Sequence, residues 1–147
     1  MKHIFIMLAW LSPVLSLHGQ TKSVELEGYD RMRYSKEEIT VAPGTSVELT
    51  MKTISDIPKS QMAHNWVLLK KDTDVDAFVN LCDQYKDNDY IAPALTSKIL
   101  AHTGMLGGGE QETITFKAPS EPGRYTYVCT FPGHYMAGMK GTLIVQE

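Results

Sequence analysis

Short runs of alternating apolar and polar residues limit most strongly how this chain can fold. Period-two alternation with many β-branched residues is typical of strands that bury one face and expose the other. Turn signals separate the runs, among them Ala42-Pro43-Gly44 and the three glycines at 107–109. Strands and turns at this spacing predict an all-β sandwich or barrel. The runs are residues 23–28, 38–53, 64–70, 112–119, 123–129 and 141–146.

Residues 72–100 break the alternation. Within 75–82, apolar residues recur at intervals of three and four, which is the spacing of one helix face. Asp72 or Asp74 precedes this segment and could cap a helix. We expect a short helix and then an irregular stretch that ends at Pro93, inserted between strands.

The first nineteen residues have the pattern of a secretory signal peptide. Lys2 is followed by an apolar stretch, residues 4–17, and Gly19 is a small residue suited to cleavage. The stretch is short for a membrane-spanning helix and contains Pro13. We therefore predict a signal peptide at 1–19, a mature domain at 20–147 and a periplasmic location. An uncleaved N-terminal anchor is the alternative.

Composition narrows the class of partner. The chain has 147 residues, which suits one domain. Its net charge of −3 provides no basic face for nucleic acid, so we expect no nucleic-acid partner. The mature chain has no apolar run long enough for a membrane span, and we expect none.

Two cysteines, Cys82 and Cys129, are present. In an exported protein they could form one disulfide. Cys129 has a better set of partners in the segment that follows it. We therefore expect Cys82 to be a buried free thiol on the helix, without a known role.

The segment from 129 to 141 carries the chemistry. It connects two predicted strands and offers a thiolate at Cys129, an imidazole at His134 and thioethers at Met136 and Met139. A second imidazole, His64, leads into an earlier strand. Two histidines, one cysteine and one weak thioether are the donor set of a blue-copper electron-transfer site.

Each of these residue types suits copper for a reason. Sulfur ligands suit Cu(I), and imidazole suits both oxidation states. Ligands held on strand ends and one tight loop move little when an electron arrives, which lowers the barrier to transfer. Pro132-Gly133 supplies the sharp turn that lets Cys129 and His134 face one point. We therefore predict one copper ion per chain.

Several segments resemble the cupredoxins, in particular the azurin and auracyanin group. They cover the chain from about Ser23 to Val145. The resemblance implies an eight-stranded Greek-key sandwich with a helical flap at 72–98. It also implies amide donors from Asn65 and Phe131 to the Cys129 sulfur. The segments are EGYDRMRYS, ITV, MAHNWVL, LAHTGMLGGGE, TITF and CTFPGH…MKGTLIV. The implied copper ligands are His64, Cys129 and His134, with Met139 axial.

The chain departs from azurins at four places. Met139 lies five residues after His134 instead of four, and Ala63 replaces a glycine, which favours a four-coordinate site. Azurins carry a titrating histidine where this chain has Thr53. The azurin disulfide is absent, and Cys82 does not replace it. The resemblance also implies that His102 is exposed and is not a ligand.

The resemblance implies a mobile one-electron carrier, not an enzyme. We expect a monomer whose redox partners dock at an apolar patch around His134. A periplasmic copper carrier or storage protein is the main alternative. A self-contained oxidase or nitrite reductase needs further copper centres built from histidine, and only His102 remains. A structural zinc site would be incomplete, because thioether is a poor zinc ligand. The expected patch residues are Phe131, Pro132, Tyr135, Met136, Ala137, Ile57, Met62, Met105 and Leu106.

Overall fold

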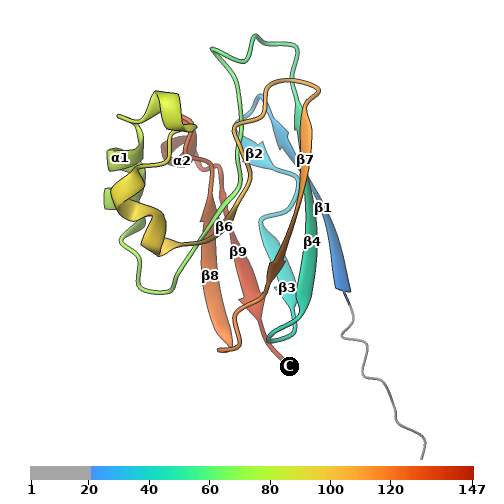
Figure 1. Ribbon diagram of the computed structural model, residues 1–147. Helices are drawn as coiled ribbons and strands as arrows, with labels where there is room; N and C mark the ends of the chain where they lie inside the picture. The colour runs from blue at the N-terminus through green and yellow to red at the C-terminus, as the bar shows by residue number, and fades with distance from the viewer. Residues whose placement is uncertain (1–20) are drawn as a thin grey trace, which may run out of the picture.

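Two β-sheets face each other in this computed structural model, which describes residues 21–147 (Figure 1). One sheet has four strands in the order β2-β1-β4-β7, and the other has five in the order β3-β9-β8-β5-β6. The strands are β1 Thr21–Tyr29, β2 Arg33–Tyr34, β3 Glu38–Val41, β4 Ser46–Ile54, β5 Val67–Leu69, β6 Ile99–His102, β7 Gln111–Lys117, β8 Gly123–Val128 and β9 Lys140–Val145.

Alternating burial produces the core between the sheets. In β4, Val47, Leu49 and Met51 are buried, while the residues between them face outward. Strands β8 and β9 contribute Tyr127 and Leu143 from the opposite sheet. The predicted alternation is therefore confirmed, and with it the all-β sandwich.

Two of the strand pairings join segments that are distant in sequence. β1 runs parallel to β4, and β3 runs parallel to β9, whereas β1 and β2 form an antiparallel hairpin. Between β2 and β3 the chain passes from one sheet to the other. Residues 21–147 contain nine strands, whereas the resemblance implied eight. The difference is one strand, and counting β2 and β3 as a single bent strand would give eight.

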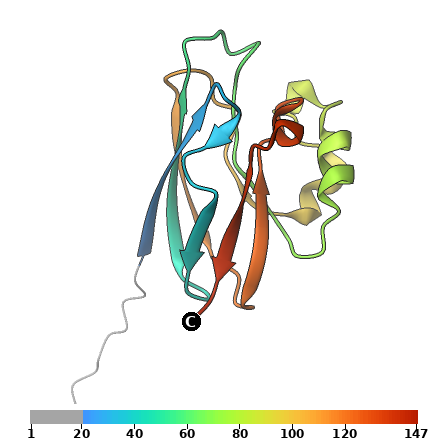
Figure 2. The ribbon, with the colours of Figure 1, turned by 180° about the vertical axis from the view of Figure 1, so that it is seen from behind.

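The predicted helix forms in the insertion, which covers the outside of the five-stranded sheet (Figures 1 and 2). It contains α1 Val75–Cys82 and two short 3₁₀ helices, η1 Lys86–Asn88 and η2 Pro93–Lys98. Asp74 is the cap, because its carboxylate accepts a hydrogen bond of 3.0 Å from the Ala77 amide. Phe78 and Val79 pack against Val67 of β5.

The cysteines are not bridged. Cys82 and Cys129 are both buried free thiols, as expected. The Cys82 sulfur accepts a hydrogen bond of 3.4 Å from the Ala92 amide. Cys82 therefore links the last residue of α1 to the start of η2.

The sequence did not predict β6. We expected an irregular stretch to Pro93 and no further strand before residue 112, but residues 93–98 form η2 and residues 99–102 pair with β5. β6 is a short edge strand with only half-buried and exposed residues. It therefore lacks the buried face that makes an alternation visible in a sequence.

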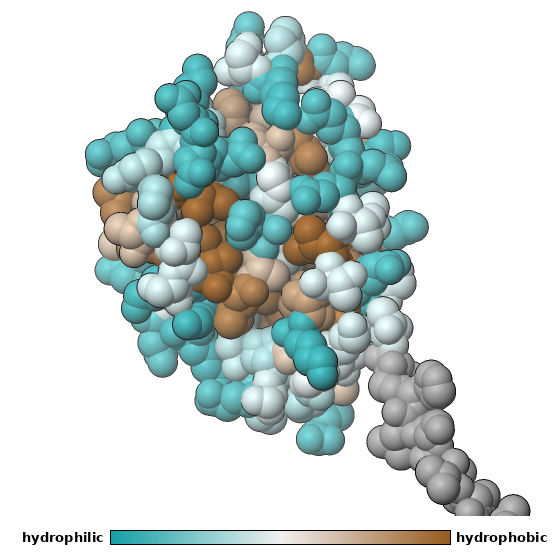
Figure 3. All heavy atoms as spheres, viewed as in Figure 1, coloured by the Kyte–Doolittle hydropathy of each residue, from teal (hydrophilic) through white to brown (hydrophobic). Residues whose placement is uncertain are grey.

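Hydrophobic side chains gather between the sheet edges β6 and β7, on the face that Figure 1 presents (Figure 3). Ala101, Ile114 and Phe116 are half-buried there and pack against the core. Leu100, also on β6, has 37% of its surface exposed to solvent and is one of the large hydrophobic residues that the described part of the chain leaves exposed.

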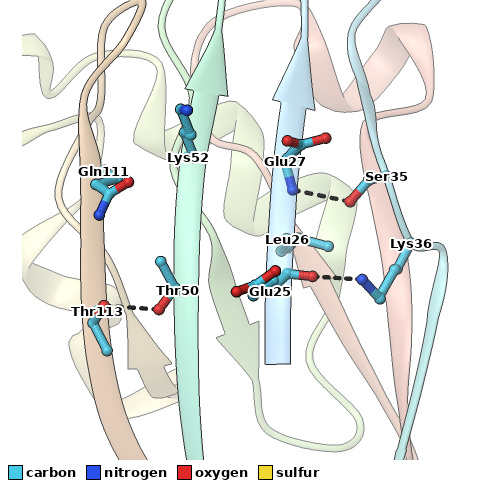
Figure 4. A pocket seen from close by; sticks show the side chains of 9 residues that line it. All are labelled: Glu25, Leu26, Glu27, Ser35, Lys36, Thr50, Lys52, Gln111 and Thr113. Carbon is cyan, nitrogen blue, oxygen red and sulfur yellow. Dashed lines mark hydrogen bonds between the residues drawn. The ribbon is translucent and has the colours of Figure 1, made fainter. Parts of the chain in front are cut away.

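A polar groove of about 590 Å³ crosses the outer face of the four-stranded sheet (Figure 4). Its polar groups bond to one another, as between Thr50 and Thr113 at 2.8 Å and between the Lys36 ammonium and the Glu25 carbonyl at 2.6 Å. The groove is lined by Glu25, Leu26, Glu27, Ser35, Lys36, Thr50, Lys52, Gln111 and Thr113.

Within residues 21–147, no helix has the length and apolar character needed to cross a membrane. The predicted signal peptide at 1–19 lies outside the described residues.

Candidate metal centre

The predicted ligand segment lies at one end of the sandwich, between β8 and β9 (Figure 1). Cys129 directly follows β8, and Met139 directly precedes β9. His64 approaches from the other side and forms a backbone bridge with Leu106. Its amide donates a hydrogen bond of 2.9 Å to the Leu106 carbonyl, and its carbonyl accepts one of 2.8 Å from the Leu106 amide. Each of these residues is therefore fixed by backbone pairing.

The segment between Cys129 and Met139 contains one helical turn, α2 His134–Ala137, which the sequence did not predict. Glycines with positive φ bound it, Gly133 at 81° and Gly138 at 106°. The Met139 amide donates to the His134 carbonyl at 2.9 Å, and the Cys129 amide donates to the Met139 carbonyl at 3.2 Å. The backbone thus holds the three residues together.

Three donor atoms converge at this end of the sandwich. The His64 and His134 Nδ1 atoms lie 3.1 Å apart, and the Cys129 Sγ lies 4.0 Å and 3.6 Å from them. A point equidistant from the corners of this triangle lies about 2.1 Å from each, close to metal–nitrogen distances of about 2.0–2.1 Å and metal–sulfur distances of about 2.3 Å. The donors therefore fit one metal ion.

Burial sets the protonation of all three groups. It lowers the pKa of His64 and of His134 to about 4, and it raises the pKa of the Cys129 thiol to about 12. The Asp30 charge and the Tyr29 carbonyl oppose the shift at His64, although no partner meets the geometry of a full hydrogen bond to its Nε2. Both imidazoles are therefore neutral near pH 7, as metal binding requires, and the thiol must lose its proton.

Asn65 links the two ligand segments. Its Oδ1 accepts from the Thr130 amide at 2.8 Å, and its Nδ2 donates to the Thr130 hydroxyl at 2.7 Å. The backbone amides of Asn65 and Phe131, which the resemblance implied as donors to the Cys129 sulfur, oppose the rise in the pKa of its thiol. Such donors favour the thiolate that a metal needs.

Burial distinguishes the other residues that the sequence singled out. Met139 is fully buried, whereas Met136 is 76% exposed and points outward. His102 lies on β6 outside the donor cluster, with its Nδ1 3.0 Å from the Thr103 carbonyl. Thr53 is buried, and its hydroxyl donates to the Leu106 carbonyl at 3.0 Å, which supports the strand bridge to His64.

Sequence reasoning missed the contribution of the β1–β2 hairpin. A Cβ added at Gly28 would lie 2.8 Å from His64 Cδ2, so glycine lets the imidazole lie against β1. The Tyr34 hydroxyl donates to the Asn65 carbonyl at 2.6 Å. A glycine within a strand pattern is a signal of close approach, and it could have pointed to Gly28.

A two-sheet sandwich that gathers two imidazoles and one thiol at a strand end defines a class, the cupredoxin-type copper proteins. A model of the copper-binding proteins of the plastocyanin/azurin family matches residues 20–146. The chain therefore belongs to this family and, within it, to the azurin and auracyanin group.

Several relatives support this assignment. The chain is 40% identical over 117 residues to auracyanin-B of Chloroflexus aurantiacus, covering 79% of this chain but only 48% of that protein. It is 37% identical over 142 residues to azurin of Bordetella pertussis, covering 94% and 91% of the two chains. A crystal structure of dithionite-reduced auracyanin from Roseiflexus castenholzii superposes with a TM-score of 0.76 at 37% identity, covering 86% and 98%.

Family and donor set together identify the cofactor as one type 1 copper ion. This confirms the predicted cofactor and the cupredoxin fold.

We predict that Gly28→Ala displaces the His64 ring. The new Cβ would contact both that ring and the Met51 methyl. The methyl is the end of a flexible side chain and can move aside, whereas the buried imidazole has to leave its present position to make room. Overpacking of this kind costs about 1–3 kcal/mol. Urea unfolding of the metal-free protein, with histidine ring signals followed by NMR, measures both effects. Gly104→Ala is the matched control, since its Cβ would meet only ordinary contacts at 3.4–3.5 Å. An unmoved His64 signal in Gly28→Ala would contradict the prediction.

Proposed function

We propose that this protein is an exported, mobile one-electron carrier that is not an enzyme. Nδ1 of His64, Sγ of Cys129 and Nδ1 of His134 would hold the copper ion, with the Met139 thioether as a weak axial ligand. The convergence of three buried donors within 4.0 Å carries the proposal. Bound copper would supply a single-electron redox couple.

The surroundings of the donors suit electron transfer more than substrate turnover. All three strong donors are buried and come from protein side chains. Backbone hydrogen bonds to Leu106 and Met139, and the bond from the Thr130 amide to the Asn65 side chain, hold them in place. Ligands that are already positioned rearrange little between oxidation states, which favours fast electron exchange.

The docking surface would surround His134, which is 3% exposed. The Phe131 ring packs against its imidazole, with centroids 4.6 Å apart and the planes tilted by 37°. Pro132, Met136 and Ala137 are exposed beside it. Met62, Met105 and Leu106, which we expected in the patch, are 7–8% exposed and would form its floor more than its surface. An exposed apolar patch of this kind suits brief contact with a redox partner.

The remaining parts of the proposal concern location and assembly. Residues 1–19 would act as the signal peptide, and 20–147 would form the mature periplasmic domain. The mature protein would act as a monomer, because a carrier must leave each partner after transfer.

We predict that Cys129→Ser abolishes an intense visible band that Cu(II) produces with the mature protein. The band requires charge transfer from a thiolate, and serine offers none. Titration with Cu(II) followed by absorption spectroscopy measures it. Cys82→Ser is the matched control and should keep the band, because Cys82 is buried in the insertion. A colourless copper complex of the parent protein would refute the proposed function.

We predict that Met139→Leu retains copper but raises the reduction potential, because loss of an axial donor disfavours Cu(II). For a one-electron couple, each tenfold change in relative affinity for the two states corresponds to about 59 mV. Voltammetry measures the shift, which we expect to be of this order. Met136→Leu is the control and should leave the potential unchanged. A shifted potential in Met136→Leu with an unchanged potential in Met139→Leu would assign the axial position to Met136.

We predict that electrons exchange between Cu(I) and Cu(II) copies of this protein far faster than copper leaves it. A copper carrier or storage protein would show the reverse order. Electron self-exchange is measured by NMR line broadening, and copper release by transfer to a chelator. Met136→Lys should slow self-exchange at least tenfold without altering the visible band, since like charges would then meet at the patch. An unchanged rate would place the docking surface elsewhere.

A further inference from the structure

One arginine reaches the ligand segment from the opposite sheet. Arg33 lies on β2 and pairs with Tyr29 of β1. Its guanidinium donates hydrogen bonds to the Ala137 carbonyl and, at 2.8 Å, to the Met32 carbonyl. Ala137 is the last residue of α2 and lies 104 positions away.

A second contact places the guanidinium against the next residue. A Cβ added at Gly138 would lie 2.8 Å from Arg33 Cζ and 2.9 Å from both terminal nitrogens. Gly138 also has a φ of 106°, which favours glycine. The arginine therefore lies directly beside the residue that precedes Met139.

The Ala137 carbonyl is at the end of α2, where helix carbonyls lack partners from the helix itself. The Gly138 amide donates to the Tyr135 carbonyl, and the Met139 amide donates to the His134 carbonyl. Within residues 21–147, the hydrogen bond that the Ala137 carbonyl accepts comes from Arg33. A cation at a helix C-terminus is stabilising, and charge-assisted hydrogen bonds are stronger than neutral ones.

We propose that Arg33 is a positioning residue of the metal centre, fixing the turn that joins His134 to Met139. The role of that turn in holding copper rests on the proposed function. The anchoring of the turn itself does not, because the contacts exist without metal. Arg33 belongs to the hairpin whose Gly28 contacts His64 and whose Tyr34 bonds to Asn65. The hairpin thus supports both ligand segments from one side.

Hydrogen exchange of the metal-free protein tests the anchor. In Arg33→Met, which keeps the aliphatic length but removes charge and donors, the Gly138 and Met139 amides should exchange at least tenfold faster. The β4 amides should not change. Arg33→Gln keeps a neutral donor, and Arg33→Lys keeps a charged donor. The exchange rates of the Gly138 and Met139 amides should therefore be highest in Arg33→Met, lower in Arg33→Gln and lowest in Arg33→Lys. If Arg33→Met does not fold, the Gln and Lys variants give the same comparison.

Arg31→Met is the matched control. Arg31 lies in the same hairpin with its guanidinium carbon 4.3 Å from the centre of the Tyr29 ring, and within residues 21–147 it forms no hydrogen bond to α2. It should leave the Gly138 and Met139 rates within twofold of the parent. Equal rates in Arg33→Met and the parent, or equal acceleration in both arginine variants, would overturn the proposal.

A readout with copper separates this proposal from the proposed function. Copper should leave Arg33→Met at least tenfold faster than the parent, and its visible band should shift, whereas Arg31→Met should match the parent in both. If the parent itself forms no coloured copper complex, the proposed function fails while the exchange result on the metal-free protein still decides the anchor. If exchange accelerates but copper release and spectrum stay unchanged, Arg33 holds the turn without positioning ligands, and the proposal fails.

Discussion

A pair of buried hydrogen bonds between Asn65 and Thr130 holds the metal centre together. Each of these residues directly follows a proposed copper ligand, His64 or Cys129, and the two bonds of 2.8 Å and 2.7 Å join segments 65 positions apart. Because an Asn side chain offers both an acceptor and donors, one residue can satisfy the backbone and the hydroxyl of Thr130 together. The two strand ends therefore cannot separate without leaving buried polar groups unpaired.

Burial around these bonds explains why a metal suits the site. Two imidazoles and a thiol are neutral there, since low polarity disfavours their charged forms. The His64 and His134 Nδ1 atoms lie 3.1 Å apart, close enough for one shared proton at most. A metal ion can satisfy both nitrogens and the thiolate at once, and thiolate and imidazole are ligands that copper favours. The amides of Asn65 and Phe131 prepare the sulfur for its charged form.

Much of this arrangement could be predicted from the sequence, because its signals are local. Alternation predicted the strands that bury one face, and the spacing of Cys129 and His134 predicted a ligand loop. β6 escaped prediction because an edge strand with no buried face leaves little alternation. The turn α2 escaped because four residues between two glycines are too few for a helical period. The roles of Gly28 and Arg33 depend on contacts between sheets, which no local pattern encodes.

These contacts between sheets resolve a conflict within the ligand segment. The proposed docking surface requires the segment to expose Pro132 and Met136, so that a partner can approach His134. Rapid electron exchange requires the same segment to hold its ligands still. An exposed turn of four residues has too few internal hydrogen bonds to remain rigid alone. Support must therefore come from behind it, and the β1–β2 hairpin lies there, with Arg33 on the Ala137 carbonyl and Tyr34 on the Asn65 carbonyl. One side of the segment is thus free to meet a partner because the other side is fixed to the opposite sheet.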